Sequence, residues 1–323
     1  MKSFLSLVLC VLLLAGCDSG KRQAVPQPSA KPPVVPMKVP QFDKARAFKF
    51  LTAQTDFGPR NPGSPGYQSC VVYLQRTLQQ YADTVLLQRF SYKSYKGQEY
   101  AGANFIARFN VFFNDRVLLT AHWDSRPWAD QDSDKTKHTK PILGANDGAS
   151  GVAVLLEIAR IFKNSPPPGG VDIVLYDGED VGESGYADSF CQGSQYFAKH
   201  LPGGSRFRYA INLDMIGDSN LEIQREANSD AYAPSVMDLV FSTARLLGIS
   251  QFSETRVGGI YDDHMPLNSV NIPAIDLIDF NYPDDSNRYW HTSQDTPDKC
   301  SPESLDAVGT VLLNVLYVQG SGS

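Results

Sequence analysis

Apolar residues recur along the chain in two alternating spacings, from about residue 43 to residue 318. Apolar positions three or four residues apart indicate helices, which we predict over 43–54, 66–82, 148–162, 193–200, 234–247 and 302–318. Short apolar runs indicate strands, which we predict over 85–92, 104–109, 116–121, 171–176, 208–213 and 273–278. Strands that alternate with helices favour an α/β fold, with a largely parallel sheet covered by helices on both faces.

The first residues lie outside this pattern. Lys2 is followed by an apolar stretch from Phe4 to Leu14, which is typical of a secretory signal and too short to span a bilayer. The ending Leu14-Ala15-Gly16-Cys17 resembles a bacterial lipobox. We therefore expect a signal peptide over residues 1–16 and a lipidated Cys17 as the first mature residue. A plain signal peptide or a short membrane anchor is the alternative.

A proline-rich stretch separates this signal from the globular part of the chain. Prolines recur between residues 17 and 40 with few apolar residues among them, so this segment is predicted to be an extended membrane tether. The remaining residues, 41–319, are enough for one α/β domain. We expect an exported bacterial lipoprotein that faces the periplasm, and Asp18 resembles the inner-membrane retention signal of enteric bacteria.

Charge and cysteine content narrow the possible partners. A net charge of −6 without a basic block argues against nucleic acid as a partner. Separately, we expect the protein to be a monomer. Cys70, Cys191 and Cys300 remain in the predicted mature chain, so at most one disulfide can form. The sequence does not decide whether it does, and no Cys-x-x-Cys pair indicates a metal cluster.

Acidic and histidine side chains collect where predicted strands end. They are His122 and Asp124 in "LLTAHWDS", Asp147 in "GANDGAS", Glu179 and Asp180 in "VLYDGED", Asp214 in "INLDMIGD", and His291 in "RYWHTSQDTPD". Ligands of open α/β sheets bind beyond the carboxyl ends of the strands, so we expect these groups on one side of the sheet. Taken singly, Asp147 is better explained as a helix cap and each histidine as a structural residue. Together, so many unpaired acids favour a bound cation.

The type of side chain indicates which cation. Imidazole and carboxylate ligands without thiolates suit Zn²⁺ in an open catalytic site. We then expect the adjacent residues Glu179 and Asp180 to have two different roles. One carboxylate faces the metal, and its neighbour is free to act as a general base.

The motifs "AHWDS", "GANDGASG", "YDGED", "LDMIGD", "DDHMPL" and "WHT" occur in the order and rough spacing of the M28 zinc aminopeptidase family. Within that family the set most resembles the glutaminyl-peptide cyclotransferases. The resemblance covers about residues 45–318 and implies a single domain with a twisted, mixed sheet flanked by helices. It also implies one zinc ion bound by Asp147, Asp180 and His291. The resemblance does not decide whether a second zinc ion binds through His122 and Asp214.

The resemblance further implies an acyltransferase that converts the N-terminal glutamine of peptides or proteins to pyroglutamate and releases ammonia. Glu179 is the implied proton carrier, and Asp214 and Asp262 are the remaining catalytic acids. The implied substrate pocket contains Trp290, with Tyr261, Tyr186 and Tyr282 as further wall residues.

Two features separate a cyclase from a dizinc aminopeptidase. This chain has Asp262-Asp263-His264 where the peptidases usually have Ser-Asp-His, and it has Trp290 before the last metal histidine. The complete dizinc ligand set is nevertheless present, so an aminopeptidase is the alternative, and a metal-free binding protein on the same fold is a third. The chain departs from the family at Asp180, which is one methylene shorter than the usual glutamate.

Overall fold

The computed structural model describes residues 38–319. The predicted signal peptide over residues 1–16, the lipidation site Cys17 and nearly all of the tether over residues 17–40 lie outside the described residues. Within residues 38–319, no helix is long and apolar enough to cross a membrane. Cys70, Cys191 and Cys300 are all buried and free, so none of them forms a disulfide in this structure.

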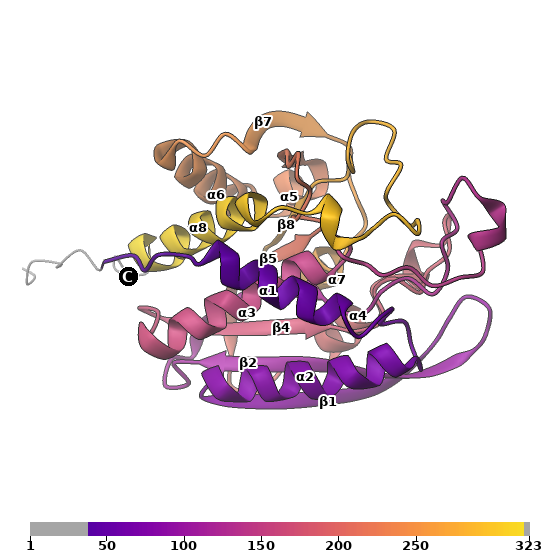
Figure 1. The fold of residues 1–323 in the computed structure, drawn as a ribbon. Helices are drawn as coiled ribbons and strands as arrows, with labels where there is room; N and C mark the ends of the chain where they lie inside the picture. Colours follow the sequence, from indigo (N-terminus) through magenta and orange to yellow (C-terminus); the bar gives the residue numbers. More distant parts are fainter. Residues whose placement is uncertain (1–37, 320–323) are drawn as a thin grey trace, which may run out of the picture. The chain divides into compact units, whose positions relative to one another are not determined.

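A six-stranded sheet forms the centre of the described domain (Figure 1). In spatial order its strands are β1 (Thr84–Lys93), β2 (Glu99–Phe109), β4 (Gly170–Tyr176), β3 (Asp115–His122), β5 (Arg206–Asp214) and β8 (Ala274–Ile278). β1 pairs with β2, and β2 with β4, in antiparallel fashion, whereas β4, β3, β5 and β8 run parallel to one another. The predicted mixed and largely parallel sheet is confirmed.

Helices cover both faces of this sheet. One face carries α1 (Lys44–Thr55), α2 (Pro65–Tyr81), α3 (Ala149–Asn164), α6 (Pro234–Leu247) and α8 (Pro302–Gln319). The other face carries α4 (Gln192–Lys199) and α7 (His264–Ser269). Short elements were not predicted: α5 (Ala227–Tyr232), α7, and a two-stranded sheet of β6 (Ile223–Glu226) and β7 (Phe252–Val257). Four to six residues are too few to show a clear period.

The central strands are apolar on both sides because both sides are covered. In β4, Val171, Ile173 and Leu175 join the core under α1, α3 and α8, whereas Val174 and Tyr176 join the core under α4 and α7. Such strands appear in a sequence as continuous apolar runs. Their parallel alignment brings the carboxyl ends of β3, β4, β5 and β8 to the same edge of the sheet.

Helix starts follow local capping chemistry. Asp43 caps α1 by accepting a hydrogen bond from the Arg46 backbone N–H, and Ser64 caps α2 in the same way through Tyr67. Pro65 occupies the first turn of α2, where its missing N–H costs no hydrogen bond. At the start of α3 the cap residue is Gly148, which makes no side-chain cap bond. The carboxylate of the preceding Asp147 is therefore not the cap of this helix.

Candidate active site

Five segments, of which the loop after β8 carries His291, place acidic and imidazole side chains at the carboxyl edge of the sheet. His122 ends β3 and Asp214 ends β5, while Asp147 immediately precedes the start of α3. Glu179 and Asp180 lie in the turn after β4, where Gly178 has a φ of 69°. A side chain at Gly178 would meet the Tyr92 ring at 2.8 Å, so this turn requires glycine.

These side chains form two overlapping groups that share Asp147. In the first, the ligand atoms of Asp147, Asp180 and His291 lie within 4.8 Å of one another. His291 Nε2 is 3.1 Å from Asp180 Oδ1 and 3.6 Å from Asp147 Oδ2. In the second group, His122 Nε2 lies 3.1 Å from both Asp147 Oδ1 and Asp214 Oδ1. All five residues are buried.

The first group fits a zinc ion. Burial and the nearby Arg126 lower the pKa of His291 to about 3, so its imidazole is neutral and keeps a lone pair for a metal. The buried Asp180 Oδ2 has no hydrogen-bond partner among the described residues. Neutral imidazole with carboxylates is a donor set that zinc prefers. Although Asp180 is shorter than glutamate, its carboxylate reaches His291 Nε2.

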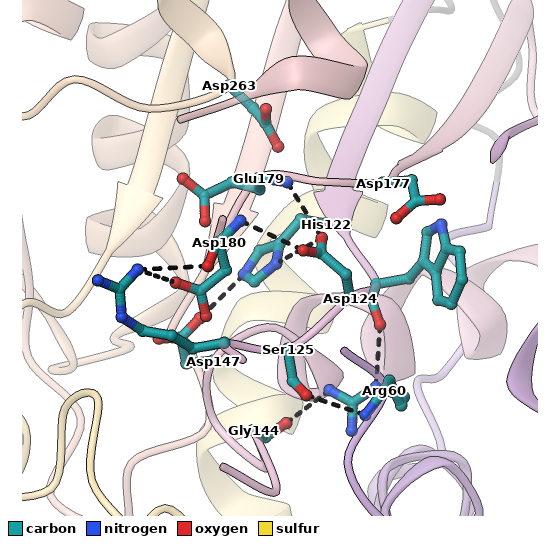
Figure 2. Close-up of polar contacts among 12 residues, drawn as sticks. Arg60, His122, Asp124, Ser125, Gly144, Asp147, Asp177, Glu179, Asp180 and Asp263 are labelled. Carbon is teal, nitrogen blue, oxygen red and sulfur yellow. Dashed lines mark hydrogen bonds and ion pairs between the residues drawn. The ribbon is translucent and has the colours of Figure 1, made fainter. Parts of the chain in front are cut away.

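Asp124 holds the turn that carries the acid pair (Figure 2). Its two carboxylate oxygens accept hydrogen bonds from the backbone N–H groups of Glu179 and Asp180, each at 3.2 Å. Its Oδ1 also lies 3.5 Å from His122 Nδ1. One buried carboxylate thus orients both the acid pair and the neighbouring histidine.

Arg126 and Asp130 support the first group and were missed by the sequence analysis. The Arg126 guanidinium donates to Asp180 Oδ1 at 3.1 Å and makes a two-pronged contact with Asp130 at 2.7 and 2.8 Å. Asp130 Oδ1 in turn lies 3.7 Å from His291 Nδ1. Arg126 lies in the polar loop after "AHWDS", and only its burial at the site distinguishes it from an ordinary loop arginine.

Glu179 lies beside this cluster with Asp262 and Cys191. One ligand atom from each of these three side chains lies within 4.8 Å of the others, and the Cys191 thiol donates to Glu179 Oε1 at 3.5 Å. Burial raises the pKa of Glu179 well above its usual range, and the nearby Asp262 adds to this effect. Burial, with Asp214, also raises the pKa of Asp262 to about 6. A carboxylate in this setting can hold and release a proton near neutral pH.

A cavity of about 400 Å³ opens beside the cluster. Glu179, Asp214, Asp262 and His291 all contribute to its lining. Its aromatic wall is made of Phe190, Tyr261, Phe280 and Trp290. Trp290 stacks on the His291 ring with centroids 3.8 Å apart, so the aromatic wall directly contacts the first group of candidate ligands.

Two predicted wall residues are placed elsewhere. Tyr282 is fully buried behind the cavity and donates a hydrogen bond to Asp295 at 2.9 Å. Tyr186 is 69% exposed and does not line the cavity, although the adjacent Gly185 does. The side-chain direction in an irregular loop depends on contacts that are distant in sequence, and the pocket role of these two residues stays a prediction.

Phe190 and Phe280 line the cavity instead and were not predicted. Phe190 lies in the loop "DSFCQG", and Phe280 lies in the loop segment that begins with "DFNY". No periodic pattern surrounds them, so no signal in the sequence distinguished them from other loop aromatics.

The fold and the site together define an α/β enzyme with a candidate metal site beyond the carboxyl ends of the parallel strands. Residues 104–316 match the model of Peptidase family M28, and the chain belongs to this family.

Similar proteins include both cyclases and an aminopeptidase. The crystal structure of a Bacteroides thetaiotaomicron glutaminyl cyclase bound to N-acetylhistamine is 37% identical, with a TM-score of 0.84, and the match covers 87% of this chain and 99% of that chain. The glutaminyl-peptide cyclotransferase of Bos taurus is 23% identical over 80% of this chain and 79% of its own length. Aminopeptidase YwaD of Bacillus subtilis is 27% identical over 64% of this chain, but the match spans only 42% of that longer protein.

Proposed function

We propose that this protein is a glutaminyl-peptide cyclotransferase that converts N-terminal glutamine to pyroglutamate and releases ammonia. The observation that carries the proposal is the shared cavity, in which Glu179 and Asp262 lie beside the metal cluster and the ring of Trp290. Similarity to glutaminyl cyclases over most of the chain supports it.

A single zinc ion at Asp147, Asp180 and His291 is the metal centre that we propose. His122 Nε2 contacts Asp147 Oδ1 and Asp214 Oδ1 directly, so these atoms are already paired, whereas Asp147 Oδ2 lies on the side of His291. Asp180 Oδ2, by contrast, is buried without a partner among the described residues. When bound, zinc polarises the side-chain carbonyl of the glutamine and stabilises the negative charge that develops on its oxygen.

The protein's own side chains transfer the proton and position the reacting groups. Glu179 takes a proton from the substrate's α-amine and delivers it to the departing amide nitrogen, which leaves as ammonia. Asp262 accepts a hydrogen bond from that nitrogen, and Asp214 orients His122 through their 3.1 Å contact. Because the attacking amine belongs to the substrate itself, holding it in place supplies much of the acceleration.

The aromatic wall protects this reaction from water. Phe190, Tyr261, Phe280 and Trp290 enclose the cavity in which the glutamine side chain would bind. Hydrolysis of the amide competes with ring closure, so excluding bulk water favours pyroglutamate over glutamate.

A comparison of two peptides tests the proposal. The full chain is incubated with a glutamine-initiated peptide and, separately, with a leucine-initiated peptide. We expect ammonia and pyroglutamate from the first and no free leucine from the second. Release of leucine would instead establish the aminopeptidase alternative.

One observation favours that alternative. His122, Asp147 and Asp214 form a second potential metal group, with ligand atoms within 4.8 Å of one another. An aminopeptidase of the dizinc type would fill both groups. Metal analysis of the purified chain therefore separates the two: one zinc per chain is expected of the cyclase, and two of the dizinc peptidase.

We also propose that the protein is exported and anchored through a lipid on Cys17. The lipobox-like sequence "LAGC" and the proline-rich segment after it support this proposal. In cell fractionation, the wild-type chain is expected with the membranes. Cys17→Ser is expected to lack the lipid when its mass is measured, and a wild-type chain whose mass shows no added lipid would contradict the proposal.

A further inference from the structure

Asp295 connects two of the candidate metal ligands. It lies four residues after His291 in the same loop and is fully buried. Its Oδ1 accepts hydrogen bonds from the Asn146 backbone N–H at 2.8 Å and from the Tyr282 hydroxyl at 2.9 Å. Its Oδ2 accepts from the Asp147 backbone N–H at 3.2 Å. The loop that carries His291 therefore also holds the backbone of Asp147.

The same arrangement occurs on the other side of the cluster. Asp124 binds the successive N–H groups of Glu179 and Asp180 just as Asp295 binds those of Asn146 and Asp147. A carboxylate suits this task because both of its oxygens accept hydrogen bonds. An asparagine at either position would turn an NH₂ group toward one of the two N–H donors, and that contact would be repulsive.

The backbone at His291 needs such support. His291 has a φ of 53°, in the left-handed region that costs a residue with a side chain roughly 1–2 kcal/mol. A ligand in a strained loop keeps its direction only if neighbouring contacts hold the loop. Asp295 lies in the loop of His291 and holds it through three hydrogen bonds, from Asn146, Asp147 and Tyr282.

We propose that Asp295 is a positioning residue that fixes Asp147 and His291 relative to each other before the metal ion binds. The inference rests on the proposed function only in that these two residues, with Asp180, bind the ion. It concerns metal affinity, so it does not depend on which reaction the enzyme catalyses.

Asp279 provides a matched control for a role in folding alone. It is also a buried carboxylate that accepts two backbone hydrogen bonds, from Glu222 at 2.8 Å and from Asn281 at 3.1 Å. Neither Glu222 nor Asn281 belongs to the candidate metal groups. Replacing Asp279 therefore removes a similar set of contacts without touching a ligand-bearing turn.

The test compares D295N and D279N in the full chain. Zinc affinity is measured by competition with a chromophoric chelator, and the stability of the metal-free protein is measured by thermal unfolding. We expect D295N to bind zinc about 10–100-fold more weakly than wild type, the range typical of residues that orient metal ligands. D279N is expected to lower the melting temperature and leave the zinc affinity within about twofold of wild type. Equal zinc affinities in D295N and wild type would overturn the proposal, as would an equal loss in both variants.

Tyr282→Phe keeps the test decisive if D295N does not fold. This variant removes one hydrogen bond to Asp295 and retains the carboxylate. We expect a zinc affinity that is lower than that of wild type by more than twofold but less than about tenfold, below the range for residues that orient metal ligands directly. An unchanged affinity contradicts the proposal. Because no substrate is used, loss of cyclase activity and loss of zinc affinity are read separately, and a failed cyclase assay leaves this result intact.

Discussion

At the scale of single residues, the site depends on buried carboxylates with different partners. The Asp180 carboxylate contacts Arg126 and His291, whereas the carboxylate of the neighbouring Glu179 accepts from the Cys191 thiol and lines the cavity. These surroundings separate a group suited to a metal from a group suited to carrying a proton. The roles proposed for these two adjacent residues of nearly identical chemistry therefore differ.

Replacing the proton carrier tests this division. Glu179→Gln keeps the shape of the side chain and removes its ability to accept a proton, so we expect kcat to fall by about 10²–10⁴-fold. Zinc content, measured by metal analysis, is expected to stay at the wild-type level. Glu183→Gln is the control, because Glu183 lies nearby and does not line the cavity, and its kcat is expected to match wild type. A normal rate in E179Q contradicts the assigned role.

Glu226 gives a prediction for the pH dependence of stability. It caps α5 and accepts hydrogen bonds from Asn228, Ser229 and Ile260, and Ile260 lines the cavity. Burial acts to raise the pKa of Glu226, but the His264 imidazole 3.5 Å away and hydrogen bonds from Ser229 and the backbone prevail and lower it from 4.5 to about 2. A lowered folded-state pKa means that the stabilisation is fully present above about pH 4.5 and is lost as the pH falls through about 2.

Glu226→Gln removes this linkage. We expect the free energy of unfolding to be roughly 3 kcal/mol lower in the variant at pH 7, with the difference shrinking steadily below pH 4.5. Denaturant unfolding of both proteins between pH 7 and pH 3 measures it. A difference that is constant across this range would show that the pKa of Glu226 is the same in the folded and unfolded protein.

At the scale of elements, the close approach of α3 to the sheet brings the ligands together. A Cβ atom on Gly151 would lie 2.3 Å from the Leu213 backbone oxygen and 3.0 Å from the Ala121 Cβ. Leu213 precedes Asp214 in β5, and Ala121 precedes His122 in β3. The start of α3 therefore sits against both strand ends, which sets the position of Asp147 beside His122 and Asp214.

An alanine at this contact should push the helix away. We expect Gly151→Ala to lower the free energy of unfolding by about 1–3 kcal/mol, the usual cost of overpacking, despite the better helix propensity of alanine. Gly169→Ala is the control, because nothing lies within 4 Å of the added atom, and its stability is expected to match wild type. Denaturant unfolding compares the three proteins, and equal stabilities would show that α3 adjusts at no cost.

At the scale of the whole molecule, the domain gathers like charges from distant segments. Asp147, Asp180 and Asp214 come from three different segments and lie within one buried cluster. Unpaired buried acids oppose folding unless a cation or protons neutralise them. The metal ion is thus expected to stabilise the fold as well as the reaction.

Zinc removal measures that contribution. A ligand that binds only the folded state adds about 4 kcal/mol when its concentration is 1,000 times its Kd, so chelation should lower the melting temperature and added zinc should restore it. The shift is expected to persist in E179Q and to be largely lost in His291→Ala. An equal shift in H291A and wild type would place the ion elsewhere.

Much of the fold was predictable because its signals are local. The spacing of apolar residues located the long helices and central strands, since periodicity within a segment reports which face is buried. The candidate ligands were predictable too, because acids and histidines at strand ends stand out against apolar runs, and the structure brings Asp147, Asp180 and His291 together. β6, β7, α5 and α7 were missed, since elements this short are stabilised by their packing.

The sequence by itself determined the class of fold and the chemistry available at one edge of the sheet. Only the tertiary structure decided which side chains face the cavity and which support the ligands. Phe190 and Phe280 line it while Tyr282 lies behind it, and Arg126 and Asp295 reach ligands that are 54 and 148 residues away in the chain. Such contacts join segments that are distant in sequence. Their geometry depends on how the whole domain packs, and no local pattern encodes it.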